Sequence, residues 1–457
     1  MQIYSSQTHK KAEFEPIEPG KVRMYVCGPT VYDNIHIGNA RTFISFDVIR
    51  RWLIAGGYEV TFAQNLTDVD DKIINRANEQ GRTAAEVATE FSNKFIDVMR
   101  RANVIDPDVR PRATKEIGPM IAMIKTLIEQ GHAYAVENGD VYFSVRSDET
   151  YGEVSGRNID DLMVGARIEE NEIKRDPLDF ALWKAAKPGE PSWKSPWGEG
   201  RPGWHTECAA MVHRYLGTPI DIHGGGSDLA FPHHENEIAQ SEALEGHKTV
   251  NYWLHGEFML VDGGKMSKSK GDFLTVSLLE SKGYDPLAYR MFCLQSHYRK
   301  PLVFSYDNLD NVESAYEKLV KKIATFKDEG EMEQEAFEAF RKKFADAIRD
   351  DLNTSMALTI VYDVVKADIS EKTKLALLND FDQVLALNLT TAGQERLDAG
   401  TSVDAELEQF INEKIAERAG AKKAKDFARA DAIRDELLAR GITIKDTREG
   451  VVWERNA

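Results

Sequence analysis

The N-terminal part of the chain has hydrophobic and polar positions in a strand–helix–strand order. Residues 22–26 form a short apolar run typical of a buried strand, and apolar residues recur at helical spacing over residues 40–54. Gly56 and Gly57 end the predicted helix, and residues 58–62 repeat the strand pattern. A helix between two such strands predicts a doubly wound parallel sheet, which binds ligands at the carboxyl ends of its strands.

The middle of the chain departs from this rhythm. Residues 117–130 have helical spacing, residues 141–145 resemble a strand, and residues 188–203 are rich in Pro, Trp and Gly. The alternating α/β pattern returns near residues 220–222 and continues to Leu260. We therefore expect an insertion between two halves of the sheet.

The C-terminal third is mainly helical in pattern. Helical spacing follows Tyr306 as far as Leu389, residues 390–402 have the composition of a linker, residues 404–440 predict one or two helices, and residues 442–453 predict a hairpin. The fold class expected is α/β: a doubly wound parallel sheet with an insertion, then an all-α helical bundle and a small C-terminal α+β domain. The expected domain bounds are 1–115, 116–200, 201–255, 256–310, 311–400 and 401–457.

Composition is that of a globular protein of several domains. The 457 residues are 42% hydrophobic, and no apolar run approaches the roughly 18 residues that span a membrane. The N-terminus has no signal-peptide pattern, and three cysteines are too few for a disulfide framework. We therefore expect a cytoplasmic protein with no membrane partner.

The net charge of −17 argues at first against a nucleic-acid partner. Residues 414–455, however, hold eleven Lys and Arg against eight Asp and Glu, a net +3, while the rest of the chain carries −20. Such a tail suits local phosphate contacts, although a solvated helix face explains the same charges.

Two short segments point to ATP. His36-Ile37-Gly38-Asn39 opens the first predicted helix, where N–H groups and the helix dipole favour phosphate, and Gly38 lets an adenine ring approach the backbone. Lys265-Met266-Ser267-Lys268-Ser269, continued by Lys270, follows the Gly263-Gly264 pair and places three positive charges on one loop. Each segment alone is a weak signal, because a histidine near a helix start is more often a cap. Together, in this order, they predict a site for the triphosphate of ATP.

A second group of residues suits a metal ion. Cys27 follows the first strand, Cys208 is far along the chain, and His233 and Glu237 are four apart after Pro232, so that the last two share a helix face. Two thiolates, an imidazole and a carboxylate are a plausible Zn²⁺ set. His234 and Glu235 compete for the same roles, and two buried, inert cysteines are the plainer reading.

Two further segments suit nucleotides. The segment from Asp221 to Asp228 holds three glycines after a strand, which permits close approach to a nucleotide; a tight flexible loop is the alternative. In the tail, basic residues are interleaved with an aromatic one, as in sites that bind single-stranded RNA, and a solvated helix is equally compatible. The tail residues expected to contact RNA are Lys422, Lys425, Phe427, Arg429 and Arg434.

With these residues in hand, the chain resembles the class I aminoacyl-tRNA synthetases and, more narrowly, the bacterial cysteinyl-tRNA synthetases. The matching strings are Tyr-Val-Cys-Gly-Pro-Thr-Val-Tyr-Asp at 25–33, Asn-Leu-Thr-Asp-Val-Asp-Asp-Lys at 65–72, Pro-Gly-Trp-His-Thr-Glu-Cys at 202–208, residues 223–237 and the lysine segment. One departure is Asn39, where the class pattern has a second histidine. An amide can still hydrogen-bond a phosphate or ribose oxygen.

The resemblance implies a Rossmann-type catalytic domain in two halves (1–115 and 201–255), a connective insertion (116–200), a stem-contact region with the lysine segment (256–310), a helical bundle (311–400) and an anticodon-binding domain (401–457). It implies one Zn²⁺ per chain, activation of L-cysteine by ATP with Mg²⁺, transfer to cysteine tRNA, and a monomer. The site residues implied are Cys27, Cys208, His233 and Glu237 for zinc, His36, Gly38, Asn39 and Lys268 for ATP, His36, Asn39, Lys265 and Lys268 for catalysis, and Thr67, Trp204, His223 and Asp228 for the amino acid and adenylate.

Three other functions compete with this interpretation. A cysteine ligase of the mycothiol-pathway type shares the adenylate chemistry but delivers cysteine to an aminosugar, which requires no tail beyond Ser402. A non-catalytic RNA-binding paralogue has no need of the lysine segment and the metal set. A zinc hydrolase lacks support, because no general base stands beside an open metal site in a familiar spacing, and His-Glu-x-x-His is absent.

Overall fold

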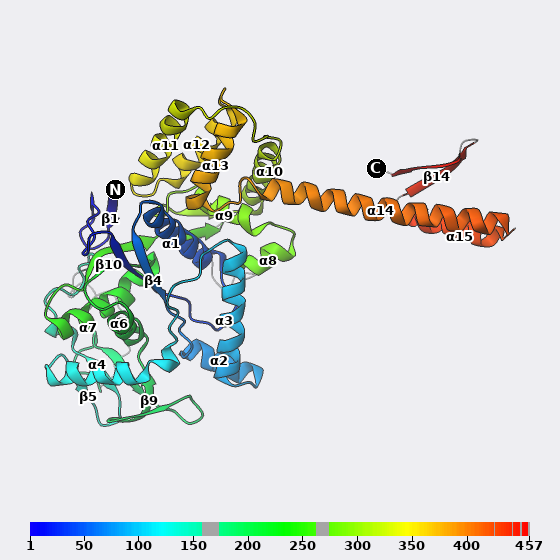
Figure 1. The fold of residues 1–457 in the computed structure, drawn as a ribbon. Helices are drawn as coiled ribbons and strands as arrows, with labels where there is room; N and C mark the ends of the chain where they lie inside the picture. Colours follow the sequence, from blue (N-terminus) through cyan, green and yellow to red (C-terminus); the bar gives the residue numbers. More distant parts are fainter. Residues whose placement is uncertain (158–172, 262–273, 425, 441, 448–449, 456–457) are drawn as a thin grey trace. The chain divides into compact units, whose positions relative to one another are not determined.

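The computed structural model describes residues 1–157, 173–261, 274–424, 426–440, 442–447 and 450–455. The chain forms two compact units, one of Met1–Leu319 with Phe326–Leu389 and the other of Val320–Thr325 with Thr390–Ala457. Figure 1 shows their elements coloured along the sequence. No helix among the described residues is both long and apolar enough to cross a membrane.

The first unit is built on a four-stranded sheet in the order β11-β10-β3-β4. The strands are β3 (Lys21–Val26), β4 (Glu59–Gln64), β10 (Ile220–Gly226) and β11 (Val250–Gly256), and all neighbours are parallel. Helix α1 (Ile37–Ala55) connects β3 to β4. The predicted strand–helix–strand unit and the doubly wound sheet are therefore confirmed.

Helices cover both faces of this sheet. The ring of Phe46 in α1 packs so closely on Gly224 of β10 that a Cβ there would lie 2.3 Å from it, so this contact requires glycine. Side chains on the other face, among them Tyr25 and Trp253, join a buried apolar cluster with three further helices. These are α4 (Ile117–Glu129), α6 (Trp204–Tyr215) and α7 (Glu235–Glu245), which lie together in Figure 1.

A second, five-stranded antiparallel sheet lies between the two halves of the parallel sheet in sequence. Its order is β5-β6-β7-β9-β8, with β5 (Ala133–Ala135), β6 (Val141–Phe143), β7 (Phe180–Ala185), β8 (Trp193–Ser195) and β9 (Gly198–Pro202). These strands fall almost wholly within the range for which an insertion was expected.

The remaining elements of this unit are short strand pairs and helices. Strands β1 (Gln2–Ser5) and β2 (Lys10–Glu13) are antiparallel, and β12 (Met259–Val261) pairs in parallel with β13 (Leu302–Phe304). The helices are α2 (Asp71–Gln80), α3 (Ala84–Arg101), α8 (Val276–Ser281), α9 (Pro286–Leu294), α10 (Tyr306–Ile323), α11 (Gln334–Arg349), α12 (Thr354–Lys366) and α13 (Glu371–Leu385). The prediction of a helical region after Tyr306 is confirmed.

The second unit contains α14 (Ala392–Lys423), α15 (Phe427–Ala439) and an antiparallel hairpin of β14 (Ile442–Thr447) and β15 (Gly450–Arg455). The predicted hairpin is confirmed, but the predicted linker at 390–402 is wrong, because α14 already begins at Ala392. A Cβ at Gly393 would lie 2.1 Å from the carbonyl oxygen of Val320. Here glycine serves close helix packing rather than a flexible connection.

Candidate metal and nucleotide site

Four side chains from distant parts of the sequence meet where β3 ends. Cys27 follows β3, Cys208 lies in the first half of α6, Glu237 is in the first turn of α7, and His233 lies just before that helix. Cys27 Sγ lies 3.6 Å from Cys208 Sγ, 3.6 Å from His233 Nε2 and 3.3 Å from Glu237 Oε1. All four side chains are buried. The candidate metal ligands chosen from the sequence thus form one cluster of donor atoms.

Close backbone packing brings these residues together. A Cβ at Gly28 would lie 1.7 Å from the carbonyl oxygen of Asn65, and a Cβ at Gly203 would lie 1.9 Å from that of Ala181. Gly28 therefore fixes the chain beyond Cys27, and Gly203 fixes the start of α6, five residues before Cys208. His233 Nε2 lies 2.9 Å from Glu237 Oε1, so the two share a face as their spacing predicted.

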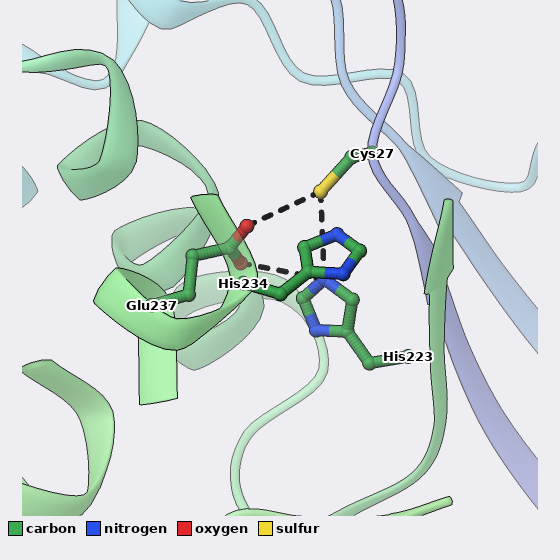
Figure 2. A group of neighbouring side chains, drawn as sticks. All are labelled: Cys27, His223, His234 and Glu237. Atoms are coloured by element: carbon green, nitrogen blue, oxygen red, sulfur yellow. Dashed lines mark hydrogen bonds and ion pairs between the residues drawn. The ribbon is translucent and has the colours of Figure 1, made fainter. Parts of the chain in front are cut away.

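The structure also shows whether His234 and Glu235, the alternative candidates for metal ligands, reach the cluster. Glu235 turns away, since its carboxylate accepts hydrogen bonds from the backbone N–H groups of Gly152 and Ser155, at 3.1 and 2.6 Å. His234, by contrast, joins His223, Cys27 and Glu237 in a second set of converging donor atoms, drawn in Figure 2.

Burial sets the protonation of the cluster. It raises the pKa of the Cys27 thiol and of the Glu237 carboxyl well above their usual values. The Cys27 thiol donates toward Cys208 and so lowers the pKa of Cys208 to about 7. Burial lowers the pKa of His223 well below its usual value, which keeps that imidazole neutral.

Residues predicted to hold a nucleotide line a cavity beside the cluster. The cavity has a volume of about 260 Å³, and its lining includes Cys27, His36, Asn39, Trp204 and Asp228. His36 is the N-cap of α1, and its Nδ1 accepts a hydrogen bond of 3.0 Å from the N–H of Gly38. The two roles considered for His36, helix cap and phosphate ligand, are therefore compatible, because Nδ1 accepts the capping hydrogen bond while a proton on Nε2 makes that nitrogen a donor.

Two other predicted substrate residues are buried next to the cluster. Thr67 follows β4, and its hydroxyl donates to Glu207 Oε2 at 3.0 Å. His223 lies in β10 and stacks on Trp253 with ring centroids 4.3 Å apart. Glu207 was missed in the sequence, although it precedes Cys208 in a string already singled out. Nothing in the local sequence indicates that this glutamate is buried.

Arg41 is another residue that the sequence did not reveal. It is buried in α1, and its two terminal nitrogens donate to four backbone carbonyl groups. Nη1 reaches Glu257 and Phe258 at 3.0 and 2.9 Å, and Nη2 reaches His297 and Lys300 at 3.1 and 2.6 Å. Arg41 thus ties α1 to the residues that lead into β12 and β13. Lys265 and Lys268, which follow β12 in sequence, lie outside the described residues.

The predicted RNA-binding residues of the tail lie in the second unit. Phe427 opens α15 with 64% of its surface exposed. Arg429 Nε pairs with Glu417 at 3.1 Å, and Arg434 pairs with Asp431 at 3.2 Å. Lys422 lies in the last turn of α14, and Lys425 lies outside the described residues. Both arginines of this set therefore already have acidic partners within their own unit.

Comparison with known proteins gives two matching family models and many relatives. The model of the class I (C) tRNA synthetase catalytic domain matches residues 13–314, and that of the cysteinyl-tRNA ligase anticodon binding domain matches residues 404–453. The cysteine–tRNA ligase of Caldicellulosiruptor saccharolyticus is 47% identical over 470 aligned residues, and that of Methylococcus capsulatus is 47% identical over 468. Both alignments cover 100% of this chain and 100% of the relative.

Solved structures share the fold at low sequence identity. Mycobacterium tuberculosis methionyl-tRNA synthetase bound by methionyl-adenylate superposes with a TM-score of 0.57 at 14% identity, over 80% of this chain and 90% of that one. The Agrobacterium radiobacter LeuRS–tRNA–LeuAMS complex gives a TM-score of 0.59 at 11% identity, over 84% and 85%. These similarities bear on the fold alone.

Proposed function

The chain belongs to the cysteinyl-tRNA synthetase family of class I aminoacyl-tRNA synthetases, and from this premise we propose that it joins L-cysteine to cysteine tRNA using ATP. One observation carries the proposal: Cys27, Cys208, His233 and Glu237 converge at the edge of the cavity that His36 and Asn39 line. Groups that can hold a thiol through a metal ion and groups that can bind phosphate thus lie next to each other, as activation of cysteine requires.

In the proposed first step the cysteine carboxylate attacks the α-phosphorus of ATP, which gives cysteinyl-adenylate and releases pyrophosphate. The step needs no protein nucleophile, so the residues act by positioning and by stabilising charge. The N–H groups of Ile37 and Gly38 at the start of α1 already donate to the Leu274 carbonyl and to His36 Nδ1, so we assign the Nε2–H of His36 as the donor of this segment to a phosphate oxygen. The amide of Asn39 adds a neutral donor, and Lys265 and Lys268 supply positive charge with Mg²⁺.

In the second step the cysteinyl group passes to the 3′-terminal adenosine of the tRNA. We assign binding of the tRNA anticodon to residues 401–457, where Phe427 has an exposed ring on which a base can stack. Residues 1–115 and 201–255 form the catalytic domain, residues 116–200 the connective insertion and residues 256–310 the stem-contact region, ahead of the bundle at 311–400.

The donor set fits zinc. Two sulfurs, one imidazole nitrogen and one carboxylate oxygen are ligands that Zn²⁺ takes, and Glu237 Oε2 accepts no hydrogen bond from any described residue. Bound there, zinc would favour a thiolate over a hydroxyl, which distinguishes cysteine from serine where an apolar pocket discriminates such near-isosteres only about 100-fold.

The protein groups around this set hold it rigidly. Trp204 stacks on His233 with centroids 4.2 Å apart, and His205 Nδ1 lies 2.9 Å from His233 Nδ1. The hydroxyl of Thr67 donates to Glu207 Oε2 at 3.0 Å and accepts from Asn65 Nδ2 at 3.3 Å, so its orientation is fixed by both neighbours.

Pyrophosphate exchange with a choice of acceptors tests the proposal. The zinc-loaded chain should exchange pyrophosphate into ATP when cysteine is present, and unlabelled tRNA should then discharge the adenylate. Discharge by an aminosugar but not by tRNA would instead assign the chain to small-molecule ligation. Absence of cysteine-dependent exchange would remove the adenylate chemistry altogether.

A further inference from the structure

Lys72 carries a positive charge at the opening of the nucleotide cavity. Four of the residues that line this cavity are exposed and therefore mark its opening: Asn39, Lys72, Trp204 and Asp228. Asn39 is assigned to ATP, and Trp204 and Asp228 to the amino acid and the adenylate. The ammonium group of Lys72 is the part of this rim that these substrates leave without a ligand.

The backbone brings Lys72 to the rim. The segments that follow β3 and β4 run side by side, because Thr30 and Thr67 form a parallel bridge in which the N–H of Val31 donates to the Thr67 carbonyl at 3.2 Å. Tyr32 and Lys72 lie further along these two segments. The ammonium group of Lys72 lies 5.5 Å from the centre of the Tyr32 ring, a contact that favours one position of the charge.

Arg76 holds the same segment one helical turn further along α2. It pairs with Asp33 at 3.1 Å, and residues four apart share a helix face. Lys72 and Arg76 therefore lie on the face of α2 that contacts Tyr32 and Asp33. Because Asp33 already has a cationic partner, this carboxylate does not neutralise Lys72.

The other carboxylates near Lys72 in sequence are also engaged. Asp70 Oδ1 accepts a hydrogen bond of 2.9 Å from the backbone N–H of Lys72 and so caps α2. Asp71 pairs with Lys184 at 3.1 Å and with Arg201. Within the described part of the chain, Lys72 makes no ion pair, so its charge is available to an anion at the opening.

Two phosphates come to this opening in the proposed reaction. One is the α-phosphate of ATP, for which His36, Asn39 and the lysine segment are already assigned. The other is the phosphodiester before the 3′-terminal adenosine of the tRNA, which arrives from solvent, where an exposed ammonium group on a flexible stem can meet it. The chain carries a net charge of −17, so the approach of a polyanion depends on cations placed locally.

We propose that Lys72 binds the phosphodiester that precedes the 3′-terminal adenosine of the tRNA and thereby positions the terminal ribose for transfer. The inference rests on the proposed function. It concerns the transfer step, so it can fail while activation of cysteine and charging of tRNA both stand.

The test measures single-turnover transfer by the zinc-loaded, full-length chain. Protein that has formed cysteinyl-adenylate is mixed with increasing amounts of cysteine tRNA. Lys72→Gln should need several-fold more tRNA for half of the maximal rate, and this loss should exceed any loss of pyrophosphate exchange. The slope of log affinity against log salt concentration should become smaller by about one, and Lys72→Arg should restore both values.

Lys94→Gln is the matched control. The ammonium group of Lys94 also lies over a ring of the cavity lining, at 5.0 Å from the centre of Phe91, but it pairs with Glu90 at 2.7 Å and does not line the cavity. This variant should transfer cysteine as the wild type does.

A tRNA with a neutral methylphosphonate at the linkage before the terminal adenosine identifies the phosphate. The wild type should lose as much on this tRNA as Lys72→Gln loses on the natural one, and Lys72→Gln should lose little more. Equal losses from the neutral linkage in both proteins would overturn the proposal, as would unchanged transfer by Lys72→Gln. An equally large loss of pyrophosphate exchange would overturn it too, because Lys72 would then act on the adenylate phosphate. Failure of the wild type to transfer cysteine to natural tRNA would instead contradict the proposed function itself.

Discussion

Arg41→Lys tests how Arg41 holds the residues that precede the lysine segment (Lys265–Lys270) in sequence. Arg41 donates to four carbonyl groups through the two terminal nitrogens of its guanidinium group, two carbonyls to each nitrogen. A lysine carries a single nitrogen and can reach one of the two carbonyl pairs at most. One carbonyl, that of Glu257 or that of Lys300, therefore loses its donor, because the Phe258 carbonyl also accepts from the N–H of Leu302 and the His297 carbonyl from the N–H of Lys300.

The size of the effect follows from that lost contact. An acceptor left without its partner costs about 1–3 kcal/mol. A loss of about 3 kcal/mol in the placement of β12 corresponds to about 100-fold in an equilibrium constant. We expect cysteine-dependent pyrophosphate exchange to lose up to about 100-fold in kcat/KM for ATP, with zinc content and the KM for cysteine unchanged.

Arg290→Lys is the matched control. Arg290 is equally buried and donates to Leu385 and Ala102 carbonyls and to Asp47, with no hydrogen bond to residues 257–258 or 297–300. It should lower the stability of the unit while leaving the KM for ATP as it was. Equal ATP kinetics in the two variants would refute the reasoning, because Arg41 would then contribute stability alone.

Three further predictions concern the metal set, acid stability and the tail. Cys208→Ala should lose its tightly bound zinc by elemental analysis and raise the KM for cysteine, and retention of that zinc would contradict the ligand assignment. Burial lowers the pKa of His213, so the unfolded chain, with a histidine pKa of about 6.5, binds this proton more readily and stability falls as the pH drops below that value. His213→Gln should flatten this fall when urea midpoints are compared at pH 7.5 and 5.5, and equal slopes would exclude the effect. Phe427→Ala should weaken binding of cysteine tRNA several-fold in a filter assay without changing pyrophosphate exchange, whereas slower exchange would indicate a wider disturbance of the fold.

The sequence predicted elements whose signal is local. The apolar run before Cys27, the helix after His36 and the hairpin near the C-terminus all have a period or turn that short segments display. The linker at 390–402 was misjudged because Gly393 is there for packing against Val320, a contact 73 residues distant in sequence that no local pattern contains.

The candidate site divides in the same way. Cys27, Cys208, His233 and Glu237 were reached from residue types and from a family resemblance, and their convergence was visible only once the fold was known. The second donor set, His205 behind His233 and the carbonyl contacts of Arg41 depend on tertiary geometry. Spacing along the chain therefore could not have shown that His234 lies in the donor cluster whereas Glu235 accepts hydrogen bonds from the backbone of Gly152 and Ser155.

Charging of unfractionated bacterial tRNA, with labelled cysteine and separately with labelled serine, tests the central claim most directly. The account predicts rapid charging with cysteine, negligible charging with serine, and loss of cysteine charging when the metal is removed by a chelator and restored on adding one equivalent of Zn²⁺. Equal charging with both amino acids, or cysteine charging that is indifferent to metal, would contradict it.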